Sequence, residues 1–127
     1  ECQAVMPLVS GDLAGFCLEG AKGNLKSELL SFSEGWSVCC ILASAGYPES
    51  SRSNDVIGGL DLVLNARVYH AGTKKIGNDW ATNGGRVLAI VAGGETRQAA
   101  VELAHAEAAK VTFDGSQRRA DIGRLHF

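Results

Sequence analysis

The chain has 127 residues, of which 46% are apolar and 20% charged, a composition typical of a folded domain and not of a disordered segment. Its 12 basic and 14 acidic side chains give a formal net charge of −2 at pH 7, which argues against nucleic-acid or anionic-membrane binding driven by bulk charge. No apolar run reaches the ~18 residues that a membrane-spanning helix needs. From the charge and the apolar pattern together, we expect neither a nucleic-acid nor a membrane partner.

Glycine and cysteine usage narrows the class of protein further. The 16 glycines are about twice the average share, which indicates many tight turns or backbone that approaches a ligand closely. The four cysteines form no Cys-x-x-Cys pair, and no histidine spacing resembles a zinc site, so we expect reduced thiols, no metal site and a cytoplasmic location. The start of the chain has neither Met at position 1 nor the features of a signal peptide, which suggests a piece of a longer protein.

The first half of the chain predicts one helix and one buried strand. Apolar residues at steps of three and four predict a helix over residues 4–19. Residues 24–33 fit either a short helix or a loop. The nearly continuous apolar run 36–44 predicts a buried strand, and the turn residues 45–48 end it. Residues 56–64, which hold two adjacent glycines, predict a broken strand or bend.

The second half predicts further strands and a second helix. In chain order we expect a strand, a polar hairpin loop, a strand, a helix, a short strand and a polar, basic tail: residues 67–70, 73–83, 86–92, 97–110, 111–113 and 114–127. Thr96 is the predicted N-cap of this helix, and Glu107 and His105 are expected on its exposed side. The order of elements predicts an α+β fold with a mixed, mainly antiparallel, barrel-like sheet and one or two covering helices.

Two loops carry the clearest chemical signal in the sequence. Gly84 and Gly85 allow backbone amides to face a ligand, and Arg86 offers a fork of donors that matches phosphate oxygens. Lys74 and Lys75 add positive charges from the preceding loop. From the pattern alone, a phosphate-sized anion site and a plain hairpin whose arginine pairs with a surface acid are both open.

Other candidates carry weaker signals. The Ala45-Gly46-Tyr47-Pro48 turn is a second candidate loop, and a plain strand-ending turn explains it equally well. His70 fits either a ligand contact or a structural residue at a strand end. The arginines of the tail fit a solvated terminus. No nucleophile pattern is present, so we predict no catalytic residue.

Six short stretches together resemble one enzyme family. They are Glu1-Cys2-Gln3, Ala45-Gly46-Tyr47-Pro48, Asp55-Val56-Ile57, His70-Ala71-Gly72-Thr73, Thr82-Asn83-Gly84-Gly85-Arg86-Val87-Leu88 and Asp121-Ile122-Gly123. In this order and spacing they resemble the C-terminal region of the phosphoribosylamine–glycine ligases (glycinamide ribonucleotide synthetases), ATP-grasp enzymes of purine synthesis. The resemblance covers essentially the whole chain.

The resemblance implies a reaction in which ATP phosphorylates the carboxylate of glycine, after which the amine of 5-phosphoribosylamine attacks the glycyl phosphate. The magnesium ligands of the family precede the position of Glu1, so we expect ATP and Mg²⁺ on the full-length enzyme and neither on this chain, which is inactive alone. Residues 1–23 are then the last helix of the ATP-grasp part. Residues 24–127 are a substrate-side domain that meets the missing N-terminal and ATP-grasp domains.

By analogy with related enzymes of purine synthesis, the resemblance implies that two cations hold the substrate phosphate and that backbone amides and side-chain donors assist them. The predicted phosphate-binding residues are Lys74, Arg86, Gly84, Gly85, Thr73 and Asn83. The role is positioning, not proton transfer. The alternative is a non-catalytic metabolite-binding or interaction module with the same fold.

Overall fold

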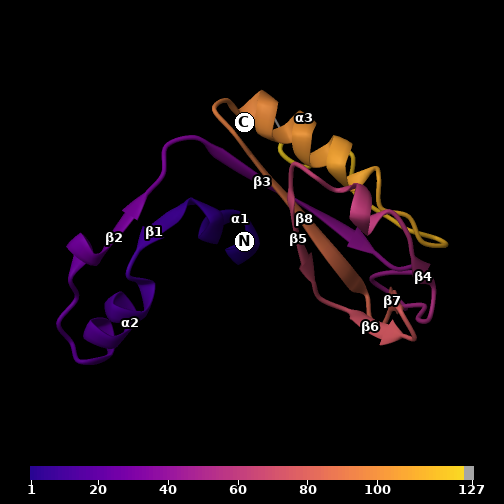
Figure 1. The fold of residues 1–127 in the computed structure, drawn as a ribbon, viewed down its shortest axis with the longest axis horizontal. Coiled ribbons are helices and arrows are strands. Elements are labelled where there is room, and N and C mark those ends of the chain that lie inside the picture. The colour runs from indigo at the N-terminus through magenta and orange to yellow at the C-terminus, as the bar shows by residue number, and fades with distance from the viewer. Residues whose placement is uncertain (125–127) are drawn as a thin grey trace.

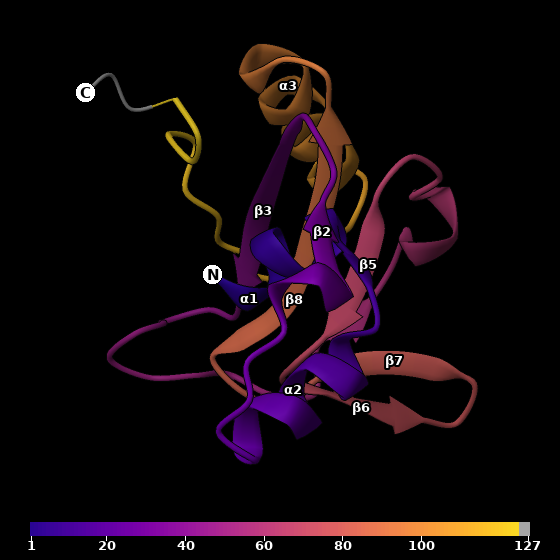
Figure 2. The ribbon, with the colours of Figure 1, turned by 90° about the vertical axis from the view of Figure 1, so that its left-hand side faces the viewer.

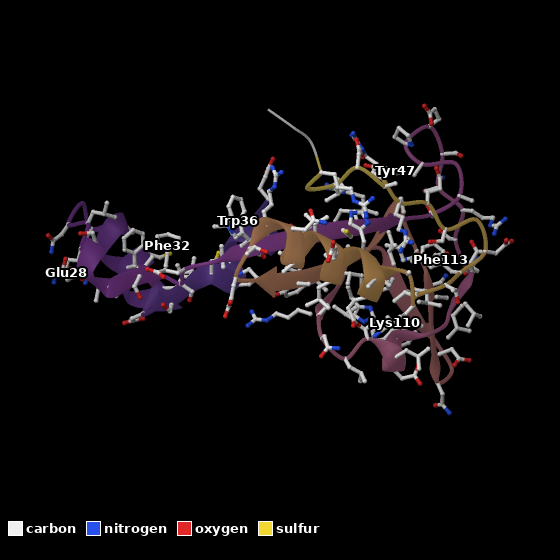
Figure 3. The ribbon with its side chains drawn as sticks, turned by 90° about the horizontal axis from the view of Figure 1, so that it is seen from above. Glu28, Phe32, Trp36, Tyr47, Lys110 and Phe113 are labelled. Atoms are coloured by element: carbon white, nitrogen blue, oxygen red, sulfur yellow. The ribbon has the colours of Figure 1, made fainter. Side chains whose placement is uncertain are left out.

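The computed structural model describes residues 1–124; residues 125–127, the end of the predicted basic tail, lie outside the described part. Figure 1 shows two regions, an arm formed by residues 1–35 and a body formed by residues 36–124. In Figure 3 the arm, with Phe32, lies at one end of the molecule and the body at the other, with Trp36 at the junction.

The centre of the body is a three-stranded antiparallel sheet with the order β3-β8-β5. The strands β3 (Trp36–Ala43), β5 (Arg67–His70) and β8 (Arg86–Gly94) lie close to the predicted ranges. Helix α3 (Arg97–Ala108) packs along one face of this sheet (Figure 1), and the central strand β8 is therefore buried from Val87 to Ala92. All strand pairs within residues 1–124 are antiparallel, and together with the helices they confirm the predicted α+β class.

The core of the body is formed by apolar side chains from β3, β4, β8, α3 and the segment after α3. Its members are Val38, Cys40, Leu42, Ile57, Val87, Leu88, Ile90, Ala92, Ala100, Val101, Ala104, Ala108, Val111 and Phe113.

A second antiparallel sheet, with the order β4-β7-β6, stands where a hairpin loop was predicted. Residues 73–83 form two strands, β6 (Thr73–Ile76) and β7 (Asp79–Thr82), and β7 also pairs with β4 (Val56–Ile57). The prediction was wrong because the polar composition hid a two-residue hairpin turn at Gly77-Asn78, where the φ of Gly77 is +61°. A short 3₁₀ helix, η3 (Leu60–Leu62), follows β4.

The caps and faces of α3 agree only partly with the prediction. Thr96 is the N-cap, and its hydroxyl accepts a hydrogen bond of 3.2 Å from the Ala99 amide. Glu107, expected in solvent, is buried, because its carboxylate accepts hydrogen bonds from the Leu64 amide (3.1 Å) and from Lys110 (2.8 Å). His105 is also half-buried, with Nε2 3.0 Å from a carbonyl oxygen of the tail.

The segment after α3 runs back along the body without forming a regular strand. The strand predicted at 111–113 reduces to one isolated bridge between Gly58 and Thr112. A second bridge joins Ala43 to Gln117 and fixes the tail along the free edge of β3. Within residues 1–124, no helix is long and apolar enough to cross a membrane.

The arm consists of short elements in place of the helix predicted over residues 4–19. They are α1 (Cys2–Val5), η1 (Met6–Leu8), β1 (Val9–Gly11), α2 (Leu13–Ala21), η2 (Ser27–Leu29) and β2 (Leu30–Phe32), with β1 paired to β2. Pro7 lies in the 3₁₀ turn, and Gly11 adopts a φ of +106° beside the Leu29 carbonyl, so a continuous helix cannot form. No residue of the arm is buried. Helix α1 lies against β3 and β8, on the side away from α3 (Figure 2), and η1 also contacts β3.

Candidate functional site

Two adjoining hollows lie beside the central sheet, and three residues, Ile41, Arg86 and Ile122, line both of them. The first hollow has a volume of about 410 Å³ and the second about 540 Å³. We call the two together the groove. Its size and its mixture of apolar walls with a few polar groups are those of a small-molecule site.

The first hollow lies between the start of the arm and the central sheet. Besides the three shared residues it is lined by Glu1, Gln3, Ala4, Ser37, Val38, Cys39, Tyr69, His70, Ala71, Leu88, Ala89 and Gly123. The hydroxyl of Ser37 is buried and has no hydrogen-bond partner among the described residues.

The second hollow lies between the turn after β3 and the tail. It is lined, besides the shared residues, by Ala43, Tyr47, Pro48, Gln117, Arg118 and Arg119. In Figure 3 Tyr47 lies close to the tail. Arg119 is held by the carboxylate of Asp121 (2.9 and 2.5 Å), and Arg118 donates a long hydrogen bond to the His105 carbonyl (3.4 Å).

Arg86 is the central charged residue of the groove. It opens β8, opposite Ala43, and its carbonyl accepts a 2.8 Å hydrogen bond from the Gly72 amide. Its exposed guanidinium forms no ion pair within residues 1–124, whereas Arg52 pairs with Asp55 and Asp114. A guanidinium without an acid partner at a concave surface is suited to bind an anionic ligand.

Lys74 lies apart from the groove lining. It is a half-buried residue of β6, paired in register with Ala81, and it lines neither hollow. The neighbouring Lys75 places its ammonium 4.8 Å from the centre of the Trp80 ring. The pairing of Lys74 with Arg86 on one phosphate stays a prediction.

The remaining predicted residues lie beside Arg86, and several of their polar groups are already engaged. The Asn83 amide donates to the Gly72 carbonyl (2.8 Å), and the Gly85 carbonyl accepts from the Ser44 amide (2.8 Å). Gly84 packs against Gly72, where a Cβ would lie 3.3 Å from the Gly72 Cα. In this structure the two glycines therefore allow close backbone packing, and a role as amide donors to phosphate stays a prediction.

Thr73 and His70 belong to one small cluster at the turn between β5 and β6. Their side chains are 3.0 Å apart (Oγ1 to Nδ1), and the His70 ring lies 4.2 Å from the Trp80 ring. Burial, assisted by the charge of Lys75, lowers the pKa of His70, so the neutral imidazole is favoured. The Thr73 hydroxyl, predicted to donate to a ligand, thus already has a hydrogen-bond partner in His70.

The cysteines next to the groove are poor nucleophiles. Burial, together with the nearby Cys39, raises the pKa of Cys40 to about 11, and burial also raises the pKa of Cys39. Neither side chain is a thiolate at neutral pH.

Within residues 1–124, no group of three or more His, Cys, Asp or Glu side chains is placed to hold a metal ion. The family resemblance implies magnesium ligands that precede Glu1, so no residue of this chain is assigned to magnesium.

Sequence patterns missed several groove residues. Ile41 and Tyr69 occupy alternate positions of predicted strands, on the face opposite the core, so their direction was readable from the pleat. Gln117 and Ile122 come from a tail without periodicity, and no local signal places them beside β3.

Comparisons with known proteins identify the family of the chain. The family described as "Phosphoribosylglycinamide synthetase, C domain" matches residues 37–125, which is most of the chain and nearly all of the body. The chain therefore belongs to this family.

Several of its relatives are named phosphoribosylamine–glycine ligases. The chain is 39% identical to the enzyme of Caldanaerobacter subterraneus and 40% identical to that of Yersinia pestis, over 96% and 97% of its own length. A crystal structure of the Thermotoga maritima phosphoribosylamine–glycine ligase matches with a TM-score of 0.81 and 31% identity over 94% of the chain. In each case the chain spans 29% of the relative's length.

Proposed function

We propose that this chain is the substrate-facing C-terminal part of an ATP-dependent ligase that joins glycine to 5-phosphoribosylamine in purine biosynthesis. The observation that carries the proposal is Arg86, an exposed arginine that forms no ion pair within residues 1–124 and lines both hollows of the groove. The names of the relatives supply the reaction, and the groove supplies a place for a phosphorylated substrate.

In this proposal the chain positions its substrate and carries out no proton transfer. Arg86 binds the phosphate of 5-phosphoribosylamine by a fork of hydrogen bonds, and Lys74 adds positive charge from β6. Holding the phosphate fixes the amine for attack on an activated glycine, and such orientation lowers the barrier by removing translational and rotational freedom. ATP and Mg²⁺, when bound, supply the activation of the glycine carboxylate from outside this chain.

The arm has a separate role in the proposal. Its apolar side chains Leu13, Leu18, Leu25 and Phe32 are 40–67% exposed, although such residues are normally buried. The chain spans 29% of its relatives, so we propose that these side chains pack against the larger remainder of the ligase.

The proposal is tested by steady-state kinetics of the longer polypeptide that contains this chain. Arg86→Ala is expected to raise the KM for 5-phosphoribosylamine at least tenfold and to leave the KM for ATP nearly unchanged, because Arg86 contacts only the phosphoribosyl substrate. Arg124→Ala removes an exposed arginine that lines neither hollow and serves as the matched control. An unchanged KM for 5-phosphoribosylamine in Arg86→Ala would remove Arg86 from the substrate site.

A second measurement separates the ligase from a module that binds nucleotides on its own. Calorimetric titration of the 127-residue chain with ATP is expected to show no binding. Micromolar affinity for ATP would contradict the proposed division of labour.

A further inference from the structure

The turn after β3 and the start of β8 are distant in sequence and build one wall of the second hollow. The Gly85 carbonyl accepts hydrogen bonds from the Ser44 amide (2.8 Å) and the Ser44 hydroxyl (3.4 Å). The Tyr47 amide in turn donates to the Ser44 carbonyl (3.3 Å). The turn is thus fixed to the residue that precedes Arg86.

The Tyr47 ring packs against the backbone of Gly85. A Cβ built on Gly85 would overlap Cδ2 of Tyr47 and lie 2.7 Å from its Cε2, a separation that real Cβ atoms do not show. Only glycine therefore allows the ring to lie against the backbone at this point. The ring is 39% exposed even so, which leaves part of it open to a ligand.

The opposite wall is equally well fixed. Gln117 exchanges two backbone hydrogen bonds with Ala43 (2.8 and 2.9 Å), and its side-chain amide donates to the Ser44 carbonyl (2.9 Å). Between the walls, Ile41 and Ile122 supply apolar surface, and Arg86 supplies a positive charge that forms no ion pair within the described part of the chain.

We propose that the second hollow binds a phosphorylated sugar, with its phosphate on Arg86 and its carbon skeleton against the Tyr47 ring. The geometry alone defines the class, a small ring compound that carries an anionic group, because a guanidinium and a partly exposed aromatic ring line the same preformed hollow. The choice of a phosphoribosyl compound within this class rests on the proposed function. Gly85 is a positioning residue, which acts through Tyr47.

The chain contains two tyrosines, and each lines a different hollow, Tyr69 the first and Tyr47 the second. Labelling with 3-fluorotyrosine therefore gives one ¹⁹F resonance for each hollow, assigned through Tyr47→Phe and Tyr69→Phe. On titration of the 127-residue chain with ribose 5-phosphate we expect a saturable shift of the Tyr47 resonance and a nearly constant Tyr69 resonance. A shift of the Tyr69 resonance alone, or of neither, would overturn the proposal.

Variants separate the two contacts. Calorimetry with ribose 5-phosphate is expected to show a Kd about three- to tenfold higher for Tyr47→Ala, from the lost ring contact. No change is expected for Phe32→Ala, which removes an exposed ring that lines neither hollow. Arg86→Ala is expected to abolish binding of both ribose 5-phosphate and inorganic phosphate, whereas Tyr47→Ala weakens only the sugar phosphate. Equal loss of both ligands in Tyr47→Ala would show that the ring does not contact the sugar and would overturn that part of the proposal.

Gly85→Ala provides the test of positioning. In the folded variant, verified by its circular dichroism spectrum, the Tyr47 resonance is expected to move before any ligand is added and the Kd for ribose 5-phosphate to rise as in Tyr47→Ala. A resonance and a Kd unchanged from the parent chain would exclude the role of Gly85.

These outcomes are independent of the ligase activity. If the Tyr47 resonance responds to ribose 5-phosphate but Arg86→Ala leaves the KM for 5-phosphoribosylamine unchanged in the longer polypeptide, the site stands and the proposed function falls. If the kinetics respond and the Tyr47 resonance does not, the substrate lies elsewhere in the groove and this inference falls alone.

Discussion

The arm and the body bury apolar surface to very different extents. Every core residue lies between Val38 and Phe113, in the body, whereas no residue of 1–35 is buried. The arm's short strands, β1 and β2, pair only with each other, and an isolated two-stranded ribbon is marginally stable in water. The body is therefore expected to fold by its own core, while the arm gains its stability from what covers it.

The largest expected difference between the regions comes from removing one apolar side chain in each. Leu88→Ala leaves a cavity in the centre of β8 and is expected to lower the free energy of unfolding of the chain by about 3 kcal/mol. Phe32→Ala, at a side chain that is 66% exposed, is expected to change it by less than about 0.5 kcal/mol. Urea unfolding followed by circular dichroism measures both, and a comparable loss in the two variants would contradict the comparison.

A pair of glycines with the same backbone conformation gives the next largest effect. Gly59 in the body has a φ of +78°, and a Cβ there would overlap the Lys110 carbonyl oxygen; Gly23 in the arm has a φ of +77° with no atom within 4 Å of that position. Gly23→Ala should therefore cost only the backbone strain, about 1 kcal/mol. Gly59→Ala should cost this and about 1–3 kcal/mol more from overpacking. Equal unfolding midpoints for the two variants would show that the contact at Gly59 relaxes freely.

Two glutamates, one in each region, are expected to make the stability of the chain depend on pH. Glu107 of the body accepts a hydrogen bond from Lys110, and Glu19 of the arm accepts one from Lys22. These hydrogen bonds are the main reason that the pKa of each carboxyl lies below its usual 4.5. A lowered pKa in the folded state gives stability that is complete above pH 4.5 and is lost as the pH falls through the folded-state pKa.

The stability gap between the parent chain and Glu107→Gln should therefore be large at pH 7 and close towards pH 3. The gap for Glu19→Gln should follow the same course with a smaller amplitude, because the Glu19 side chain is 19% exposed against 3% for Glu107. Urea midpoints at both pH values measure the gaps, and a Glu107 gap that does not depend on pH would assign its role to packing.

The body was also the more predictable region from sequence. Strands β3 and β8 are long apolar runs, and α3 has a capping threonine and a regular apolar face, so local patterns were sufficient. The prediction for the arm was wrong because its apolar spacing fits a helix. Its structure instead depends on Pro7, on the positive φ of Gly11 and on pairing between segments about twenty residues apart. Such non-local pairing leaves no periodic signal.

Contacts between distant segments also limited what could be predicted of the groove. Arg86 was identified from its glycine-rich loop, and the turn at Tyr47 was identified as a candidate, but their contact through Gly85 depends on two distant segments meeting. Lys74 was predicted as a phosphate-binding residue because it lies in the polar segment before Gly84. Its strand, β6, places it outside the lining of both hollows.

Amide hydrogen exchange tests the central claim most directly, namely that the body is stable on its own and that the arm, as proposed above, is completed by the remainder of a longer polypeptide. In the 127-residue chain, the amides of β3 and β8 should exchange only through global unfolding, and those of β1, α2 and β2 should exchange orders of magnitude faster. In the longer polypeptide the arm amides should become protected. Arm amides that are as well protected as β8 in the 127-residue chain would contradict the claim.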